Sequence, residues 1–141
     1  MRMRILTVIG LLVLASISLH ADQPKTKVEL ISVEELKAKI TSKQPVTIID
    51  VRSTSSLGNE ERIPGAIHVK LRRLRSRLKF APLKDVPKDR DVVTYCACPG
   101  EETSLRAAEV LIAAGFTRVR ALKSGWTGWV KAGGPIETPR R

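Results

Sequence analysis

The stretch from residue 91 to residue 108 constrains the fold of this chain most. A short apolar run ends in Cys96, a turn-forming Cys98-Pro99-Gly100 segment follows, and a helical pattern begins behind Thr103 and Ser104. That order predicts a strand, a loop and a helix. In such a unit the N–H groups of the loop and the positive N-terminal end of the helix converge just beyond the strand, where Cys96 lies. A thiol at that point is favoured as the thiolate, which is the nucleophilic form.

Short apolar runs alternate with helical patterns along the rest of the chain. The run 46–51 is almost wholly apolar, as expected of a buried parallel strand that is covered on both faces. Shorter runs at 67–69 and 119–122 predict further strands. Helices are expected over residues 33–41, where Ser32 and Glu35 form a capping box, over the basic segment 70–79, behind Ser104, and around Trp126 and Trp129. The pattern predicts a parallel α/β domain with helices on both faces and a ligand site beyond the carboxyl ends of the strands.

The first 21 residues differ from the rest of the chain. A basic start precedes an uncharged, largely apolar run from Ile5 to Leu19, and Ala21 precedes the first acidic residue. This pattern is typical of a cleaved secretory signal peptide over residues 1–21. The alternative is an uncleaved membrane anchor, although a span needs roughly twenty apolar residues. The protein is therefore expected to be periplasmic or secreted, with a polar lead at 22–31, one domain at 32–136 and a basic tail at 137–141.

The net charge of +11 is concentrated in one segment. Residues 70–79 contain six cations, and Leu71, Leu74 and Leu78 fall between them at helical spacing. Two interpretations stay open: a solvated helix face, or a docking face for an anionic surface or an acidic protein partner. Nucleic acid is not expected as a partner, because the chain is predicted to be exported and has no platform of aromatic and basic residues.

Three polar residues lie at the ends of predicted strands. Asp50 and Arg52 are two positions apart, so their side chains point the same way, and the pair is interpreted as a structural ion pair that fixes the next loop. His68 lies between two β-branched apolar residues, which favours a side chain at the edge of the core over a catalytic base.

Four short blocks carry a family resemblance. They are Ile48-Ile49-Asp50-Val51-Arg52, Ile63-Pro64-Gly65-Ala66, Val93-Thr94-Tyr95-Cys96, and Ala114-Gly115-Phe116 with Gly125-Trp126-Thr127-Gly128-Trp129. In this order and spacing, over roughly residues 32–136, the chain resembles the rhodanese family of single-domain sulfurtransferases. The resemblance implies a three-layer domain with a central parallel sheet, and a catalytic Cys96 that takes sulfane sulfur from a small donor such as thiosulfate as a persulfide. The sulfur then passes to a thiol acceptor or to cyanide. No cofactor and no metal are implied, and a monomer is expected.

The loop after Cys96 departs from the family pattern. It is about two residues longer than usual, and it carries Glu101 and Glu102 where a cation is common. A carboxylate beside the site repels an anionic donor and raises the pKa of a thiol. Phosphatase and arsenate reductase relatives also have longer loops, but they need a terminal Arg that this loop lacks. The loop is expected to form an anion cradle of Ala97, Pro99, Gly100, Glu101, Glu102, Thr103 and Ser104.

Positive potential for that cradle has several candidate sources. Arg62 replaces a common His in the family pattern, and Arg62, Arg52 or Arg106 could supply the missing charge. Asp50, Arg52 and Arg62 are accordingly expected to give structural or electrostatic support to the site.

Cys98 is an auxiliary thiol that the family pattern does not explain. Cys96 and Cys98 form a C-x-C pair and are the only two cysteines in the chain. Cys98 could resolve a persulfide or a sulfenate on Cys96, could bind a metal, or could merely pack the loop.

Two functions therefore stay open. The leading one is an exported sulfurtransferase or sulfur carrier with Cys96 as its nucleophile. The alternative is a binding or thiol-redox module of the same fold without sulfurtransferase activity, which uses the Cys96/Cys98 pair or the basic helix.

Overall fold

The computed structural model describes residues 27–53 and 60–139. The predicted signal peptide at 1–21 lies outside these residues, as do residues 22–26 of the expected lead and the last two residues of the expected tail. Within the described part of the chain, no helix is long and apolar enough to cross a membrane.

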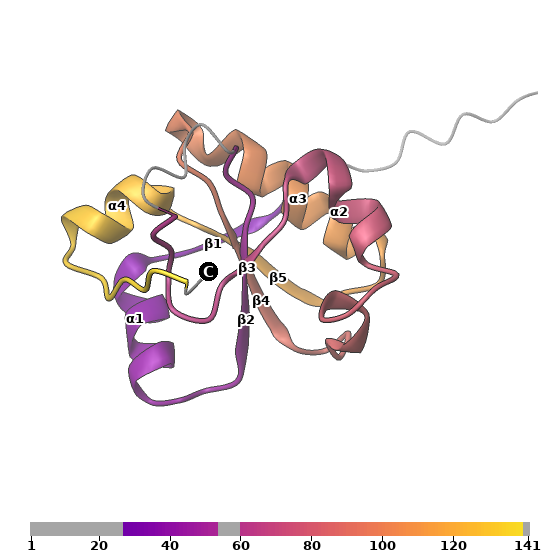
Figure 1. The fold of residues 1–141 in the computed structure, drawn as a ribbon, viewed down its shortest axis with the longest axis horizontal. Coiled ribbons are helices and arrows are strands. Elements are labelled where there is room, and N and C mark those ends of the chain that lie inside the picture. The colour runs from indigo at the N-terminus through magenta and orange to yellow at the C-terminus, as the bar shows by residue number, and fades with distance from the viewer. Residues whose placement is uncertain (1–26, 54–59, 140–141) are drawn as a thin grey trace, which may run out of the picture.

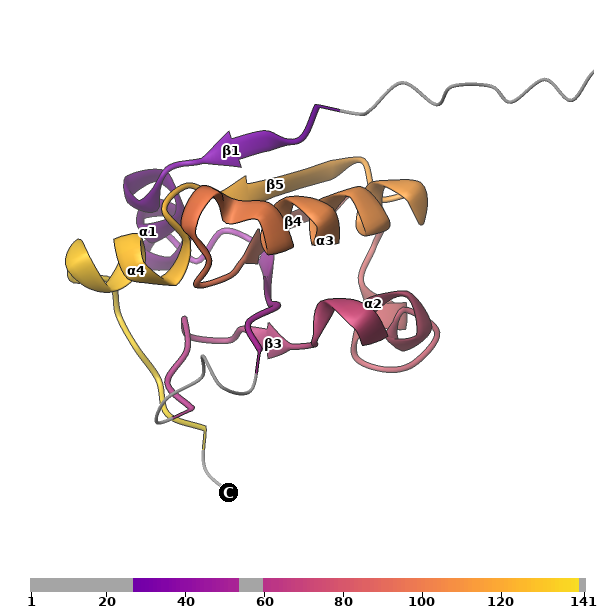
Figure 2. The same ribbon diagram turned by 90° about the horizontal axis from the view of Figure 1, so that it is seen from above.

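A five-stranded parallel sheet forms the centre of the molecule. Its spatial order is β1-β5-β4-β2-β3, and every neighbouring pair is parallel. Figure 2 shows β1 and β5 side by side with their arrowheads in the same direction. The strands are β1 (Glu29–Ile31), β2 (Val46–Asp50), β3 (Ile67–His68), β4 (Asp91–Tyr95) and β5 (Arg118–Leu122).

Two helices cover each face of the sheet (Figure 1). One pair is α1 (Val33–Thr41) and α4 (Gly125–Lys131), and the other is α2 (Leu71–Arg77) and α3 (Glu102–Ala113). Each face buries its own apolar cluster, which includes Leu36, Ile63 and Trp129 under the first pair and Leu74, Val92 and Leu111 under the second. The expectation of a three-layer α/β domain with a central parallel sheet is confirmed.

Local sequence signals explain where the helices begin and end. Ser32 Oγ accepts the N–H of Glu35 at 3.1 Å, so the capping box at the start of α1 is confirmed. α3 begins at Glu102, slightly before the start expected from sequence. Gly100 and Glu101 have φ angles of 74° and 58°, and these left-handed residues turn the chain directly into the helix.

β1 is the one strand that the sequence pattern did not predict. It lies at the edge of the sheet and pairs only with β5, and Glu29 and Leu30 are exposed while Ile31 is buried. A three-residue edge strand with a single buried side chain carries too little periodicity to be recognised.

The parallel strands bring four chain segments to one edge of the sheet. Val51 N–H donates to the carbonyl of Tyr95, and Val69 N–H donates to that of Asp50, so the ladder continues beyond the strand ends. Residues that follow β2, β3, β4 and β5 therefore meet at the carboxyl edge, where ligands of such sheets bind.

Candidate active site

Cys96 is the first residue after β4 and is held firmly at the carboxyl edge. Its side chain is buried, and its carbonyl oxygen accepts the N–H of Trp126 at 2.8 Å. Gly125, with φ at 49°, packs so closely that a Cβ there would overlap the same carbonyl oxygen. The turn between β5 and α4 therefore fixes the position of Cys96 through backbone contacts alone.

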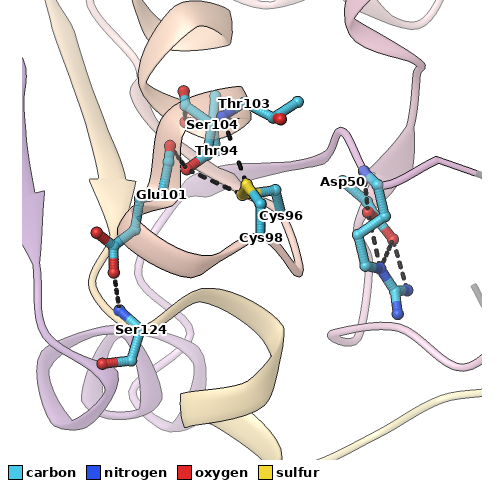
Figure 3. The surroundings of a disulfide bond; sticks show 9 residues. Asp50, Thr94, Cys96, Cys98, Glu101, Thr103, Ser104 and Ser124 are labelled. Atoms are coloured by element: carbon cyan, nitrogen blue, oxygen red, sulfur yellow. Dashed lines mark hydrogen bonds and ion pairs between the residues drawn. A yellow bond between two sulfur atoms is a disulfide. The ribbon is translucent and has the colours of Figure 1, made fainter. Parts of the chain in front are cut away.

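Cys96 and Cys98 form a disulfide, with their Cα atoms 5.7 Å apart (Figure 3). Thr103 N–H, in the first turn of α3, donates to Cys98 Sγ at 3.5 Å, and Cys96 Sγ lies 3.7 Å from Ser104 Oγ. In this state neither sulfur is a nucleophile, because both valences of each atom are filled. Reduction would yield two thiols next to the N-terminal end of a twelve-residue helix.

The two loop glutamates do not line the cysteine site. Glu101 turns its carboxylate away from the disulfide, toward the start of α4, where it accepts the N–H of Ser124 at 2.6 Å (Figure 3). Glu102 is exposed at the first position of α3, where its negative charge interacts favourably with the positive end of the helix dipole. The sequence suggested two carboxylates facing the nucleophile, whereas the structure uses one of them to connect the loop to α4.

A pocket of about 420 Å³ opens beside the two cysteines. Ala97, Cys98 and Thr103 line it from the loop, and Lys70 and Arg72 line it from the start of α2. Pro99, Gly100 and Ser104 of the expected cradle are not among its lining residues. The pocket thus combines the two sulfur atoms with cationic side chains from a different segment of the chain.

Of the three arginines that the sequence suggested as a source of positive charge, Arg52 lines this pocket, whereas Arg62 and Arg106 do not. Arg106 lies in a neighbouring groove, and Arg62 forms a backbone bridge with Glu137 while its Nε has no hydrogen-bond partner among the described residues. Arg52 lines the pocket, but its guanidinium is paired with Asp50. Lys70 and Arg72 were missed as site residues. Their position directly after the apolar run 67–69 was the available signal, because residues after parallel strands meet at one edge.

The Asp50–Arg52 pair is buried and structural, as the sequence indicated. Arg52 Nη2 lies 2.7 Å from Asp50 Oδ2, and the Tyr95 hydroxyl donates to the same oxygen at 2.9 Å. Burial lowers the pKa of Arg52, but the hydrogen bond and the charge of Asp50 outweigh it and raise that pKa overall. Burial and Asp50 together raise the pKa of Tyr95. The guanidinium also lies over the ring of Trp126, 4.3 Å from its centre, so the network joins β2 and β4 to α4.

His68 is half-buried at the end of β3, as expected for a residue at the edge of the core. Its Nδ1 has no hydrogen-bond partner among the described residues and lies 3.9 Å from Asp50 Oδ1. Burial lowers the pKa of His68, Asp50 opposes this, and Arg62, Arg52 and Lys70 lower the pKa further. On balance the neutral imidazole is favoured more than it is in an unperturbed histidine.

The residues described by the structure contain no group of three His, Cys, Asp or Glu side chains that could hold a metal ion.

Comparisons with known proteins agree on one family. Residues 32–132 match the rhodanese-like domain. A protein of Allochromatium vinosum named sulfurtransferase is 30% identical over 109 residues, which cover 77% of this chain and 94% of that protein. The mouse thiosulfate sulfurtransferase/rhodanese-like domain-containing protein 3 is 28% identical over 107 residues, which cover 71% of this chain and 67% of that protein.

A solved structure shows the same architecture. The crystal structure of the Alr3790 protein from Anabaena superposes with a TM-score of 0.66 at 32% identity, and the match covers 77% of this chain and 82% of that one.

Proposed function

Because the chain belongs to the rhodanese-like domain family, whose relatives include sulfurtransferases, we propose that it is an exported sulfurtransferase or sulfur carrier that holds sulfane sulfur as a persulfide on Cys96. One observation carries the proposal: a cysteine at the carboxyl end of β4 shares a pocket with Lys70 and Arg72. That arrangement joins a sulfur nucleophile to a site for an anion.

The proposed reaction begins with the dithiol form of the protein. The Cys96 thiolate attacks the outer sulfur of thiosulfate, the sulfur–sulfur bond of the donor breaks, and sulfite leaves with the electron pair. Lys70 and Arg72 attract the donor dianion and the departing sulfite. An acceptor thiol or cyanide then takes the sulfane sulfur and restores the Cys96 thiolate.

The location belongs to the proposal as well. A basic start, an apolar run and Ala21 before the first acidic residue support export through a signal peptide at residues 1–21. Exported cysteine pairs meet oxidants, and the Cys96–Cys98 disulfide is compatible with that environment. Turnover there requires a supply of reductant.

We propose an acidic, thiol-bearing protein as the sulfur acceptor. A groove of about 540 Å³ between α2 and α3 is lined by three arginines and one carboxylate, with apolar side chains between them: Arg72, Arg75, Arg106, Glu109, Leu71, Val110 and Ala113. The cations outnumber the carboxylate by three to one. Leu71 and Arg72 also line the cysteine pocket, so the groove and the pocket adjoin at these two residues. A partner with carboxylates would fit the three arginines while its thiol reaches Cys96.

The disulfide also favours a second candidate function. A thiol-redox module would cycle between the Cys96–Cys98 disulfide and the dithiol without carrying sulfane sulfur. This candidate needs no sulfur donor, so the two functions can be distinguished by whether the protein takes sulfur from a donor.

A thiosulfate:cyanide assay tests the leading proposal. The full chain is reduced with dithiothreitol, freed of the reductant and supplied with thiosulfate and cyanide, alongside Cys96→Ser and Cys98→Ser. We expect thiocyanate from the wild type and from Cys98→Ser, and none from Cys96→Ser. A reduced, folded wild type that forms neither thiocyanate nor sulfite would contradict the proposal and favour the thiol-redox module.

A further inference from the structure

The second cysteine has no role in the transfer reaction just described, yet the structure joins it to the nucleophile. Cys98 lines the same pocket as Cys96, and their sulfur atoms are bonded to each other. The loop conformation therefore places the Cys98 sulfur within bonding distance of the Cys96 sulfur. Cys96 itself is held in position by β4 and by the turn before α4.

We propose that Cys98 resolves the persulfide on Cys96, releases its outer sulfur as sulfide, and so makes the protein a dithiol-dependent reductase of sulfane sulfur. The inference rests on the proposed function, because it begins from the persulfide that the transfer reaction forms. The Cys96–Cys98 disulfide is the product of this step.

The surroundings of Cys98 favour its thiolate. Thr103 N–H already donates to Cys98 Sγ at 3.5 Å from the first turn of α3, and Lys70 and Arg72 line the same pocket. A hydrogen bond, a helix N-terminus and nearby cations each lower the pKa of a thiol. Glu101, a loop carboxylate whose charge would oppose this effect, accepts the N–H of Ser124 instead.

The bond between the two Sγ atoms shows that Cys98 Sγ can reach Cys96 Sγ, and the proposed step uses that approach. Attack on the outer sulfur would move the persulfide to Cys98, whereas attack on Cys96 Sγ gives the observed disulfide. In that second step the bond from Cys98 Sγ to Cys96 Sγ forms and the bond from Cys96 Sγ to the outer sulfur breaks. The outer sulfur leaves with the electron pair and takes up a proton as hydrosulfide. The sulfane sulfur is reduced and the two cysteines are oxidised.

A dithiol reductant returns the protein to its starting state. Both cysteines line the pocket, and Cys98 is the more exposed of the two, so an incoming thiolate has the easier approach to Cys98 Sγ. Cys96 then leaves as the thiolate, ready for the next donor, and the second thiol of the reductant frees Cys98. The complete cycle converts thiosulfate and a dithiol into sulfite, hydrogen sulfide and an external disulfide.

Single-turnover chemistry tests this step. Reduced full-length protein, freed of dithiothreitol, receives one equivalent of thiosulfate with no acceptor, and sulfite, sulfide and the intact protein mass are measured. We expect the wild type to release sulfite and sulfide in equal amounts and to lose two hydrogen atoms. Cys98→Ser should release sulfite alone and gain one sulfur atom. Cys98→Ala provides a second variant without the thiol, and circular dichroism verifies that each variant is folded.

The outcomes separate the inference from the function on which it rests. Sulfite without sulfide from the wild type, with a stable persulfide on the protein, would overturn the resolving role and leave the sulfurtransferase proposal intact. Equal sulfide release from wild type and Cys98→Ser would also overturn it. Absence of sulfite from every reduced form would overturn both.

Discussion

The carboxylate of Glu101 accepts the backbone N–H of Ser124 at 2.6 Å, and both residues have left-handed backbones with φ angles of 58° and 61°. A non-glycine residue in this region costs about 1–2 kcal/mol, and a hydrogen bond to a charged group contributes about 1.5–3 kcal/mol. The bond therefore offsets much of the strain of the two residues that it joins. It connects the cysteine loop to the turn that holds Cys96.

Replacing Glu101 separates its structural role from its charge. Glu101→Ala removes the acceptor and is expected to lower the free energy of unfolding by about 1–2 kcal/mol. Glu101→Gln keeps a hydrogen-bond acceptor and should lower the free energy of unfolding by less. Urea unfolding measures this free energy for both variants. Because the carboxylate is turned away from the pocket, the KM for thiosulfate should be the same in Glu101→Gln and wild type, and a clear fall in that KM would show that the charge faces the donor.

Arg72 and Arg73 are adjacent on α2 but line different pockets. Arg72 lines the cysteine pocket, and Arg73 lines a separate pocket with His68. Removing one charge close to a bound anion in water costs about 1 kcal/mol, which is about five-fold in binding. Arg72→Gln is therefore expected to raise the KM for thiosulfate by about that factor, and Arg73→Gln should leave it unchanged. Equal effects would mean that only the overall charge of the helix matters.

Gly125 is expected to be far less tolerant of alanine than Gly133. Both glycines have positive φ angles, 49° and 63°, but a Cβ at Gly125 overlaps the Cys96 carbonyl whereas nothing lies within 4 Å of one at Gly133. Gly133→Ala should cost about 1 kcal/mol of stability. Gly125→Ala should cost about 1–3 kcal/mol more and should reduce sulfur transfer, because it moves the nucleophile. Thermal unfolding and the thiocyanate assay compare the two variants.

The groove between α2 and α3 should matter for a large acceptor and not for a small one. With Arg75→Glu and Arg106→Glu combined, sulfur transfer to a cysteine peptide flanked by glutamates is expected to slow, and transfer to cyanide should be unchanged. A peptide whose cysteine is flanked by lysines instead of glutamates serves as the control acceptor. Equal rates with both peptides, in wild type and variant alike, would contradict docking of an acidic partner.

His68 should make the protein less stable just below neutral pH. Its pKa in the folded state lies below the ordinary value of 6.5, so the unfolded chain binds the proton more readily as the pH falls through 6.5. The contribution of neutral His68 is thus fully present above pH 6.5 and declines below it. His68→Gln should flatten that slope in urea titrations. Burial raises the pKa of Asp91, but the hydrogen bonds and charges of Lys39 and Arg118 outweigh it and lower that pKa overall. The stability that Asp91 contributes is lost only as the pH falls below about 3.8, so it does not overlap with the effect of His68.

Much of the fold could be predicted from the sequence because its signals are local. Ser32 and Glu35 mark the start of α1, the apolar run 46–51 requires burial on both faces, and Gly115 ends α3. The ion pair of Asp50 and Arg52 followed from their spacing at a strand end. Each of these depends on neighbours within a few residues.

The features that could not be predicted depend on contacts between distant segments. Lys70 and Arg72 reach the cysteine pocket because β3 pairs with β2, which lies beside β4. From the sequence alone, the two residues are indistinguishable from the other cations of a basic helix face. Glu101 turns away from the pocket because Ser124, distant in the chain, offers an N–H. The C-x-C spacing allowed a disulfide, a metal ligand pair or simple packing, and only the loop conformation distinguishes among them.

The cations and the cysteines belong to separate segments of the chain that meet only through folding. Lys70 and Arg72 stand at the start of α2, while Cys96 and Cys98 stand on the loop that leads into α3. Under the proposed function, substitutions in the first turn of α2 are therefore expected to change the preference for a sulfur donor while the two cysteines keep their positions.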